Sequence, residues 1–394
     1  MTYTCEVVTG ADRLLSLEKE VIGGLRIGLL TNPTGITSRF ESLIDVCGSA
    51  SSAVLTALFA CEHGIRGEKQ AGVLFEDETD PLLGIPVFSL YGTNKKPTEE
   101  MMSTVDAVIF DIQDLGVRFY TYLTTLAYML EACAQYGKRL VVLDRPNPLG
   151  GIVCEGGLLQ PGFESMVGAG PVPFRTGLTI GEFARYFNSR LEKPCELQVI
   201  PMLNWRRGME YPATGLPWLM PSPNMPTMDT VRVYAGHCLF EGTNVSEGRG
   251  TTRPFELIGA PWIDGRRLCE RMSRLQLPGV HYHPVTFTPM FSKHQGQLCG
   301  GVQAFVTSPG SYRSVMSALY LLHTVIDMHP TEFEWIAPFK EGRKPFIDYL
   351  SGSDAVRTAI HKPEGLQGII SAWDSQTGEW ERTRQPYLLY GVDA

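Results

Sequence analysis

Short apolar runs alternate with amphipathic segments over the first 200 residues. The runs have the length and composition of buried strands; they are Leu25–Thr31, Val54–Ala60, Ile85–Leu90, Val105–Phe110, Leu140–Leu143 and Leu197–Pro201. Helical spacing or helix-start signals separate them, at Ser38–Cys47, after Pro97, at Tyr120–Tyr136 and at Leu178–Arg190. Because strands that alternate with helices form parallel sheets with crossover connections, we expect an α/β fold with a mostly parallel sheet.

The pattern becomes mixed after residue 226. Helices and strands are both predicted there, at Asp229–Leu239, Asp264–Leu275, Gly279–Pro289, Gly301–Thr307 and Tyr312–Met328. The preceding segment, Trp218–Pro226, ends in closely spaced prolines, which favour a rigid and extended connection. We therefore expect a parallel-sheet domain over residues 1–226 and a smaller α+β domain over residues 227–394.

Three of the predicted strands end in polar clusters. Glu62 and His63 follow the run that ends at Ala60, Asp111–Asp114 follow Phe110, and Asp144–Pro148 follow Leu143. Parallel strands place their carboxyl ends along one edge of the sheet, and ligands bind at that edge. The clusters should therefore converge on a single site.

Composition narrows the class of partner. The chain has 394 residues, of which 43% are hydrophobic and 19% are charged, as in a well-packed globular protein. Its formal net charge is −8 and its pI is about 5.6. An acidic chain without basic runs argues against nucleic acid or an anionic membrane as the main partner.

The cysteines and the N-terminus indicate a compartment. The nine cysteines are scattered, form no CxxC pair and lie mostly in apolar surroundings, which favours free thiols in a reducing environment without structural zinc. The first residues carry no basic and apolar leader, and no apolar stretch approaches the roughly 18 residues of a membrane span. We therefore expect a cytoplasmic protein without a membrane span.

Glu62 is the strongest candidate for a catalytic acid. It is the first carboxyl after a buried strand, in the segment Glu62–Gly67, and a carboxyl group in a part-buried cleft can serve as a proton donor. The alternative is a structural ion pair between Glu62 and Arg66. His63 is a weaker candidate, since a lone histidine beside glycine is more often packed or hydrogen-bonded than catalytic.

The segment after the fourth strand suits a polyhydroxylated ligand. Asp111, Asp114, Arg118, Tyr120 and Tyr122 offer carboxylates, a guanidinium and phenols, which bind hydroxyl groups and pack on sugar rings. Alternatively, Asp111 caps the next helix and the tyrosines pack beneath it. The DxxD spacing alone is weak evidence for magnesium, so no metal is expected. The alternation of elements is Rossmann-like, but GxGxxG is absent, so no dinucleotide or other cofactor is expected.

A glycine-rich loop in the second domain, residues 241–252, also carries many hydrogen-bonding groups. Glu241, Thr243, Glu247 and Arg249 could close over a ligand, and a guanidinium binds carboxylates well. The alternative is a loop held together by its own glutamate–arginine pair. The remaining candidate ligand-binding residues lie between prolines or in turns at strand ends: Asn32, Asp144, Asn147 and Asn224.

Taken together, these segments resemble the exo-acting β-N-acetylmuramidases of the NamZ type. The resemblance is carried by the motifs Thr31–Gly35, Glu62–Gly67, Asp111–Tyr122, Asp144–Pro148, Pro221–Pro226, Phe240–Asn244 and Ser246–Thr251. It implies a Rossmann-like N-terminal domain, a smaller C-terminal domain and an active site in the cleft between them. It also implies release of N-acetylmuramic acid from the non-reducing end of peptidoglycan-derived glycans, with Glu62 as the catalytic residue.

The chemistry beyond Glu62 stays open at this point. Glycosidases commonly pair a general acid with a second carboxylate, here Asp111, Asp114 or Glu241, unless the 2-acetamido group of the substrate attacks instead. Arg66, Arg118 or Arg249 should meet the lactyl carboxylate of muramic acid. Many relatives carry secretion signals, so action outside the cell or on recycled fragments is open, as is a homodimer. A muropeptide amidase or peptidase and a non-catalytic two-lobed muropeptide-binding protein are the alternative functions.

Overall fold

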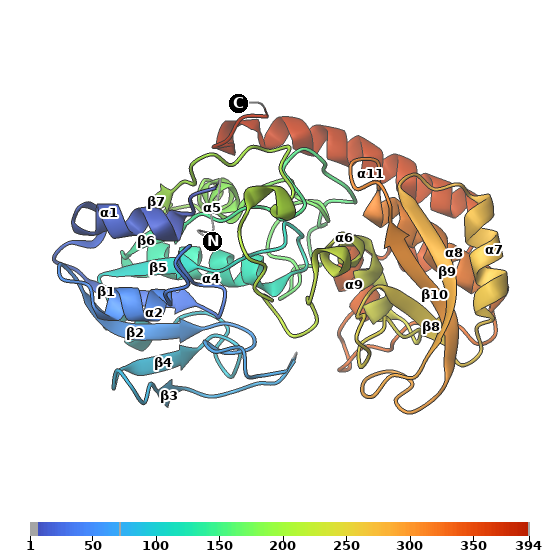
Figure 1. The fold of residues 1–394 in the computed structure, drawn as a ribbon, viewed down its shortest axis with the longest axis horizontal. Coiled ribbons are helices and arrows are strands. Elements are labelled where there is room, and N and C mark those ends of the chain that lie inside the picture. Colours follow the sequence, from blue (N-terminus) through green and yellow to red (C-terminus); the bar gives the residue numbers. More distant parts are fainter. Residues whose placement is uncertain (1–6, 71, 393–394) are drawn as a thin grey trace.

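The computed structural model describes residues 7–70 and 72–392, which form two lobes side by side (Figure 1). The N-terminal lobe is built on a seven-stranded sheet with the order β3-β4-β2-β1-β5-β6-β7. Its strands are β1 Arg26–Thr31, β2 Val54–Ala60, β3 Glu78–Thr79, β4 Pro86–Ser89, β5 Ala107–Asp111, β6 Arg139–Leu143 and β7 Glu196–Ile200. Neighbouring strands pair in parallel except β3 with β4. The expected α/β fold with a mostly parallel sheet is therefore confirmed.

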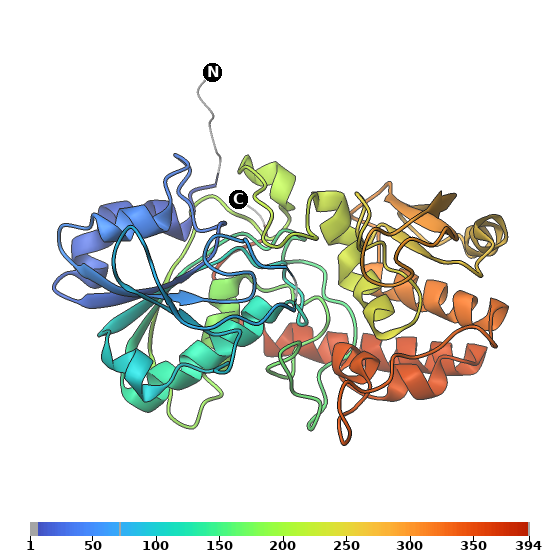
Figure 2. The same ribbon diagram turned by 90° about the horizontal axis from the view of Figure 1, so that it is seen from below.

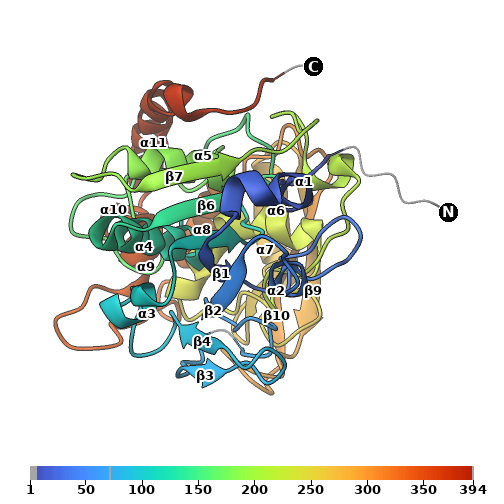
Figure 3. The same cartoon turned by 90° about the vertical axis from the view of Figure 1, so that its left-hand side faces the viewer.

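Helices cover both faces of this sheet (Figure 3). The helices α1 (Gly10–Ile22) and α2 (Leu43–Gly48) pack on one face, while α4 (Thr121–Tyr136) and α5 (Ile180–Asn188) pack on the other. Alternate residues of a strand point to opposite faces of the sheet. Ile109 therefore packs in the core beneath α1 and α2, whereas Val108 and Phe110 pack in the core beneath α4 and α5. Burial on both faces explains why these strands read as continuous apolar runs.

Local signals fix several helix ends as expected. The Thr179 hydroxyl accepts a hydrogen bond from the Glu182 amide, and the Glu182 carboxylate accepts one from the Thr179 amide, so the predicted capping box begins α5. Gly137 ends α4 in the left-handed conformation, with φ of 62°. The helix predicted from Ser38 is shorter, because Ser42 caps α2 at Leu43. The short helix α3 (Glu99–Ser103) begins after Thr98.

The C-terminal lobe contains a three-stranded antiparallel sheet in the order β8-β10-β9, formed by Leu257–Ala260, Cys299–Val306 and Val280–Phe287. The helices α6 (Met228–His237) and α7 (Gly265–Arg274) pack against it, and α8 (Ser314–Met328) packs on these two helices. The smaller α+β part is thus confirmed, although β8 was not predicted from the sequence.

The last elements lie across both lobes (Figures 1 and 2). After α9 (Phe346–Ser351) and α10 (Ala355–Ala359), the long helix α11 (Pro363–Thr383) packs on α8 of the C-terminal lobe. It also reaches the N-terminal lobe, where Trp380 donates a hydrogen bond to the Thr176 carbonyl at 2.8 Å and Trp373 lies 5.0 Å from the Phe174 ring centre. The boundary predicted at residues 226–227 stays a prediction.

The structure also bears on the cysteines and on the expected absence of a membrane span. Eight cysteines of the described chain are unpaired, while Cys5 lies outside the described residues. Within residues 7–70 and 72–392, no helix combines the length and the apolar character needed to cross a bilayer.

Candidate active site

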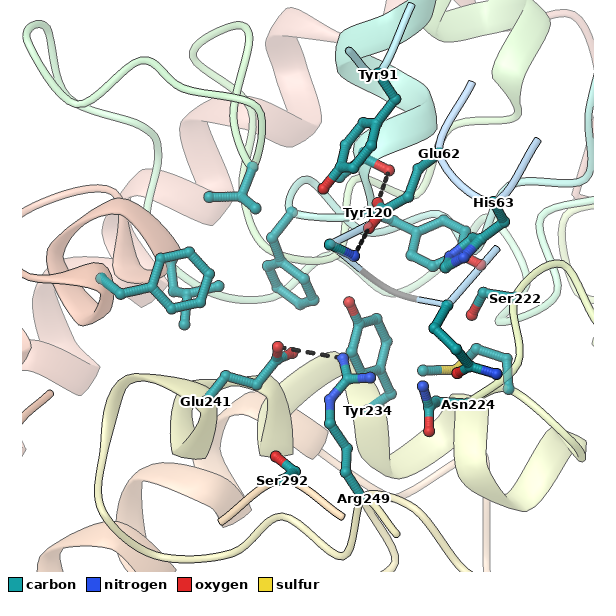
Figure 4. Close-up of a pocket in the computed structure, with 18 of the residues that line it drawn as sticks. Glu62, His63, Tyr91, Tyr120, Ser222, Asn224, Tyr234, Glu241, Arg249 and Ser292 are labelled. Carbon is teal, nitrogen blue, oxygen red and sulfur yellow. Dashed lines mark hydrogen bonds and ion pairs between the residues drawn. The ribbon is translucent and has the colours of Figure 1, made fainter. Parts of the chain in front are cut away.

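A cleft of about 1040 Å³ lies between the two lobes. Its polar lining comes from both of them: Glu62, His63, Gln70, Tyr91, Tyr120, Thr121, Ser222 and Asn224 from the N-terminal lobe, and Tyr234, Glu241, Arg249 and Ser292 from the C-terminal lobe. Apolar side chains complete the wall: Phe119, Val167, Met225, Phe291, Phe339, Phe346 and Leu350. Figure 4 shows the labelled polar groups facing one another across this space.

Glu62 is positioned by the end of β2 and by a sharp turn behind it. His63 and Gly64 both adopt positive φ, 76° and 77°, so the chain reverses just past the carboxyl end of the strand. One carboxylate oxygen accepts a hydrogen bond from the Gly72 amide at 3.0 Å, and the other accepts one from the Thr121 hydroxyl at 2.9 Å (Figure 4). The side chain is therefore oriented by two separate segments while it faces the cleft.

Tyr91 lies beside Glu62 in the cleft. Burial raises the pKa of Tyr91, and the nearby carboxyls of Glu62, to which it hydrogen-bonds, and Glu241 raise it further. The phenol thus stays protonated and lies within electrostatic range of two carboxyl groups. Tyr91 was missed in the sequence, although it follows β4 in the way that Glu62 follows β2.

The C-terminal lobe contributes a charged network around Arg249. The Arg249 guanidinium lies 3.3 Å from a carboxylate oxygen of Glu241 and 3.3 Å from one of Glu247. Lys293 forms a further ion pair with Glu247 at 2.8 Å. Burial raises the pKa of Glu241, and the positive charge of Arg249 opposes that shift. Arg249 and Glu241 line the cleft, whereas Glu247 supports Arg249 from behind.

Further candidates beside Glu62 line the same cleft. His63 is buried and its ring Nδ1 lies 2.9 Å from the Lys69 carbonyl, which fixes the turn. The Tyr120 hydroxyl is buried near Ser222, and burial raises its pKa. Asn224 faces the cleft from the proline-rich connection (Figure 4).

The three predicted aspartates are buried and are not among the residues that line the cleft. Asp111 forms a bidentate ion pair with Arg145, at 2.5 and 2.7 Å. Asp114 accepts a hydrogen bond from the Gly116 amide at 2.5 Å, and burial raises its pKa to about 7. Asp144 accepts hydrogen bonds from Thr179, the Gly181 amide and Tyr390, and burial raises its pKa to about 7 as well. These contacts hold together segments that do not line the cleft.

Two of the three candidate arginines are engaged in structural contacts. Arg66 pairs with Asp80 at 2.6 Å and not with Glu62. Arg118 is fully buried and donates hydrogen bonds to the carbonyls of Gly157, Val172 and Leu350. Because burial lowers the pKa of Arg118 to about 9, the three carbonyls that face it matter for keeping its charge. Neither arginine lines the cleft.

Four other predicted residues shape loops near the site rather than its wall. The Asn32 side-chain oxygen accepts a hydrogen bond from the Thr34 amide at 2.9 Å. Asn147 donates to the Leu178 carbonyl at 2.9 Å, and the Tyr122 hydroxyl donates to the Pro221 carbonyl at 2.5 Å. Thr243 donates to the Phe240 carbonyl at 2.9 Å.

Among the described residues, no group of three or more His, Cys, Asp or Glu side chains is placed to hold a metal ion. Residues 27–229 match the model for the N-terminal part of the exo-β-N-acetylmuramidase NamZ, and residues 232–390 match the model for its C-terminal part. The chain belongs to the NamZ exo-β-N-acetylmuramidase family.

Individual relatives agree with this assignment. The chain is 45% identical over 385 residues to the peptidoglycan β-N-acetylmuramidase NamZ of Bacillus subtilis strain 168, covering 98% of this chain and 92% of that protein. It is also similar to two crystal structures of DUF1343 family proteins from Bacteroides fragilis NCTC 9343. One is 33% identical with a TM-score of 0.91, covering 98% of this chain and all of that one. The other is 30% identical with a TM-score of 0.74, covering 98% and 99%.

Proposed function

We propose that this protein is a glycoside hydrolase that releases terminal N-acetylmuramic acid from the non-reducing end of peptidoglycan fragments. The observation that carries the proposal is Glu62, which faces a polar cleft between two lobes in a chain 45% identical to a peptidoglycan β-N-acetylmuramidase. A cleft lined by hydroxyls, an amide, carboxyls and aromatic rings suits a sugar ligand.

Glu62 serves as the general acid in this proposal. Its proton passes to the oxygen that links muramic acid to the next sugar while the bond from that oxygen to the anomeric carbon breaks. The Gly72 amide and the Thr121 hydroxyl hold the carboxyl group in place, so little reorganisation is needed when the proton moves.

Arg249 is the residue proposed to bind the lactyl carboxylate that distinguishes muramic acid from glucosamine. Of the three arginines considered from the sequence, it is the one that lines the cleft. Its bonds to Glu241 and Glu247 are both 3.3 Å long, which leaves room for a closer bidentate contact with an incoming carboxylate. A substrate without that carboxylate would leave the arginine poorly satisfied, which favours the acidic sugar.

Release of the free sugar also needs a new bond between the anomeric carbon and the oxygen of a water molecule. The group that assists this step is proposed to be either Glu241, as the base for that water or as a nucleophile that water later displaces, or the 2-acetamido group of the substrate, whose cyclic intermediate water opens. Of the carboxyls considered from the sequence, Glu241 lines the cleft with Glu62, while Asp111 and Asp114 are buried and do not line it. If the acetamido group attacks the anomeric carbon, Tyr120 and Asn224 are placed to orient it, since both line the cleft beside Ser222.

The direct test is incubation of the protein with a disaccharide in which N-acetylmuramic acid is β-linked to N-acetylglucosamine. Release of both free sugars, unaffected by a metal chelator, is the expected result. Cleavage of a stem peptide without sugar release would instead support a muropeptide amidase or peptidase. Tight binding of the disaccharide without any product would support a non-catalytic binding protein.

A further inference from the structure

The cleft has an apolar side that the proposed catalytic groups do not use. Phe291, Phe339, Phe346 and Leu350 all come from the C-terminal lobe and line the same space as Glu62. Phe339 is 81% exposed and Phe291 is 47% exposed. Large apolar side chains that stay exposed within a groove are typical of ligand-binding surfaces. We call these four residues the apolar wall.

The loop that presents Phe291 is held in a strained conformation. Ser292 and His294 have φ of 70° and 55°, in the left-handed region that residues with a Cβ atom rarely adopt. Between them, Lys293 donates hydrogen bonds to the carbonyls of Phe240 and Val245 and pairs with Glu247. Such strain persists only where the surroundings fix the backbone, and it clusters at sites that clamp ligands.

The same loop contacts the backbone next to Arg249. The Met290 amide donates a hydrogen bond to the Gly250 carbonyl at 2.9 Å. Gly250 has φ of 82°, and a Cβ atom there would lie 2.5 Å from the Phe291 carbonyl oxygen. Phe291 is therefore fixed relative to Arg249, so one rigid unit carries both a polar and an apolar contact surface.

The rest of the apolar wall is fixed from the N-terminal lobe. Phe339 packs edge-on against Phe346, with ring centres 5.6 Å apart. Phe346 and Leu350 lie on α9, and the Leu350 carbonyl accepts a hydrogen bond from the buried Arg118 at 2.8 Å. Arg118 thus holds this wall in place although it does not line the cleft itself.

We propose that the apolar wall binds the leaving sugar of the substrate, with Phe291 and Phe339 packing against the apolar face of its ring. This inference rests on the proposed function. The volume of about 1040 Å³ lies at the upper end of the roughly 300–1,000 Å³ of small-molecule sites, so the cleft has room for more than one sugar ring. Arg249 and the polar groups around Glu62 account for the acidic sugar, and aromatic rings provide the flat apolar surface that the second ring requires.

The test compares two substrates whose leaving groups are both alkyl alcohols. One is the muramic acid–glucosamine disaccharide, and the other is the methyl β-glycoside of N-acetylmuramic acid, which lacks the second ring. We expect Phe291→Ala and Phe339→Ala each to lower kcat/KM for the disaccharide by about three- to tenfold, the range of one aromatic contact, and to leave the methyl glycoside unchanged. Phe305→Ala is the matched control, because Phe305 is 44% exposed in the same lobe and does not line the cleft.

Each outcome has a defined meaning. If both variants treat the two substrates alike, or if Phe305→Ala has the same effect, the apolar wall does not bind the leaving sugar and the inference is wrong. If the wild-type protein hydrolyses neither substrate, the proposed function is wrong, and this inference, which rests on it, is wrong as well. A melting curve for each variant separates loss of the contact from loss of the fold.

Discussion

Replacing Glu62 by glutamine separates its chemical role from its structural one. Glutamine keeps the shape of the side chain and one oxygen, which can still accept the hydrogen bond from the Gly72 amide. The Thr121 hydroxyl can rotate and accept a hydrogen bond from the new amide group instead of donating one. We therefore expect Glu62→Gln to change the free energy of unfolding by no more than about 0.5–1.5 kcal/mol, the net worth of one hydrogen bond.

The expected loss of activity is much larger. An amide cannot supply the proton that the departing sugar oxygen needs, and general acids contribute about 10²- to 10⁴-fold to the rate. At 1.36 kcal/mol for each factor of ten, that corresponds to about 3–5 kcal/mol of transition-state stabilisation. The effect on turnover is thus several times the effect on stability, so the two can be distinguished in one set of variants.

The assay follows release of N-acetylmuramic acid from the disaccharide and from an aryl glycoside, beside a thermal melting curve. A good leaving group needs less help from an acid, so kcat should fall less for the aryl glycoside than for the disaccharide. Glu68→Gln is the control, because Glu68 lies on the same loop and its side chain is 44% exposed. Its ion pair with Lys69 is long, with 3.6 Å between the Lys69 Nζ and a Glu68 carboxylate oxygen. Turnover of the disaccharide near the wild-type value in folded Glu62→Gln, or equal loss in Glu68→Gln, would refute the assignment.

Three other predictions follow from the charged groups. Arg249→Gln should reduce the ratio of kcat/KM for muramic acid glycosides to kcat/KM for N-acetylglucosamine glycosides by about 10- to 100-fold, as expected for a charged hydrogen bond. The control Arg253→Gln, at an exposed arginine, should leave this ratio unchanged. An unchanged ratio in Arg249→Gln would exclude Arg249 as the carboxylate ligand. Asp111→Asn should lower the free energy of unfolding by about 3–5 kcal/mol in urea titrations, because Arg145 would be left buried without its partner; a loss below 1 kcal/mol, on the order of a surface pair, would contradict this. Asp114 has its folded pKa raised to about 7 from 3.8, so the stability it contributes is present at low pH and declines by about 1.4 kcal/mol per pH unit between pH 4 and 7. Asp114→Asn should reduce that decline in urea titrations at pH 5 and pH 8, and an unaltered pH dependence would show that Asp114 does not titrate in this range.

Much of the parallel sheet could be predicted because its strands are buried on both faces. β2 occupies the predicted residues Val54–Ala60, and the sharp turn behind it delivers Glu62 and His63 to the cleft. The helix α1 was missed even though Thr9 and Asp12 form a capping box at its start. The strand β8 has only four residues, too few for a clear periodic signal.

The site was harder to predict than the sheet. The end of a strand fixes where a residue lies along the sheet, but it does not fix the direction in which the side chain points. Asp111 and Glu62 both follow apolar runs, yet Asp111 turns toward Arg145, a residue that arrives from the next strand. Tyr234, Phe291 and Phe339 reach the cleft through packing of the second lobe, and nothing in their local sequence marks them. Tyr91 carried the same signal as Glu62, since it follows β4, and could have been found.

The long helix α11 limits how the substrate can enter. Trp373 and Trp380 cover Phe174 and Tyr186 of the N-terminal lobe. The start of the helix contacts α8, where Gln367 donates a hydrogen bond to the Tyr320 hydroxyl at 3.0 Å. Because α11 is packed on both lobes, it resists a wide hinge opening: separating the lobes would expose those aromatic rings to water. Glycan ends should therefore enter past the exposed side chains at the rim, such as Phe339, while the two lobes keep their spacing.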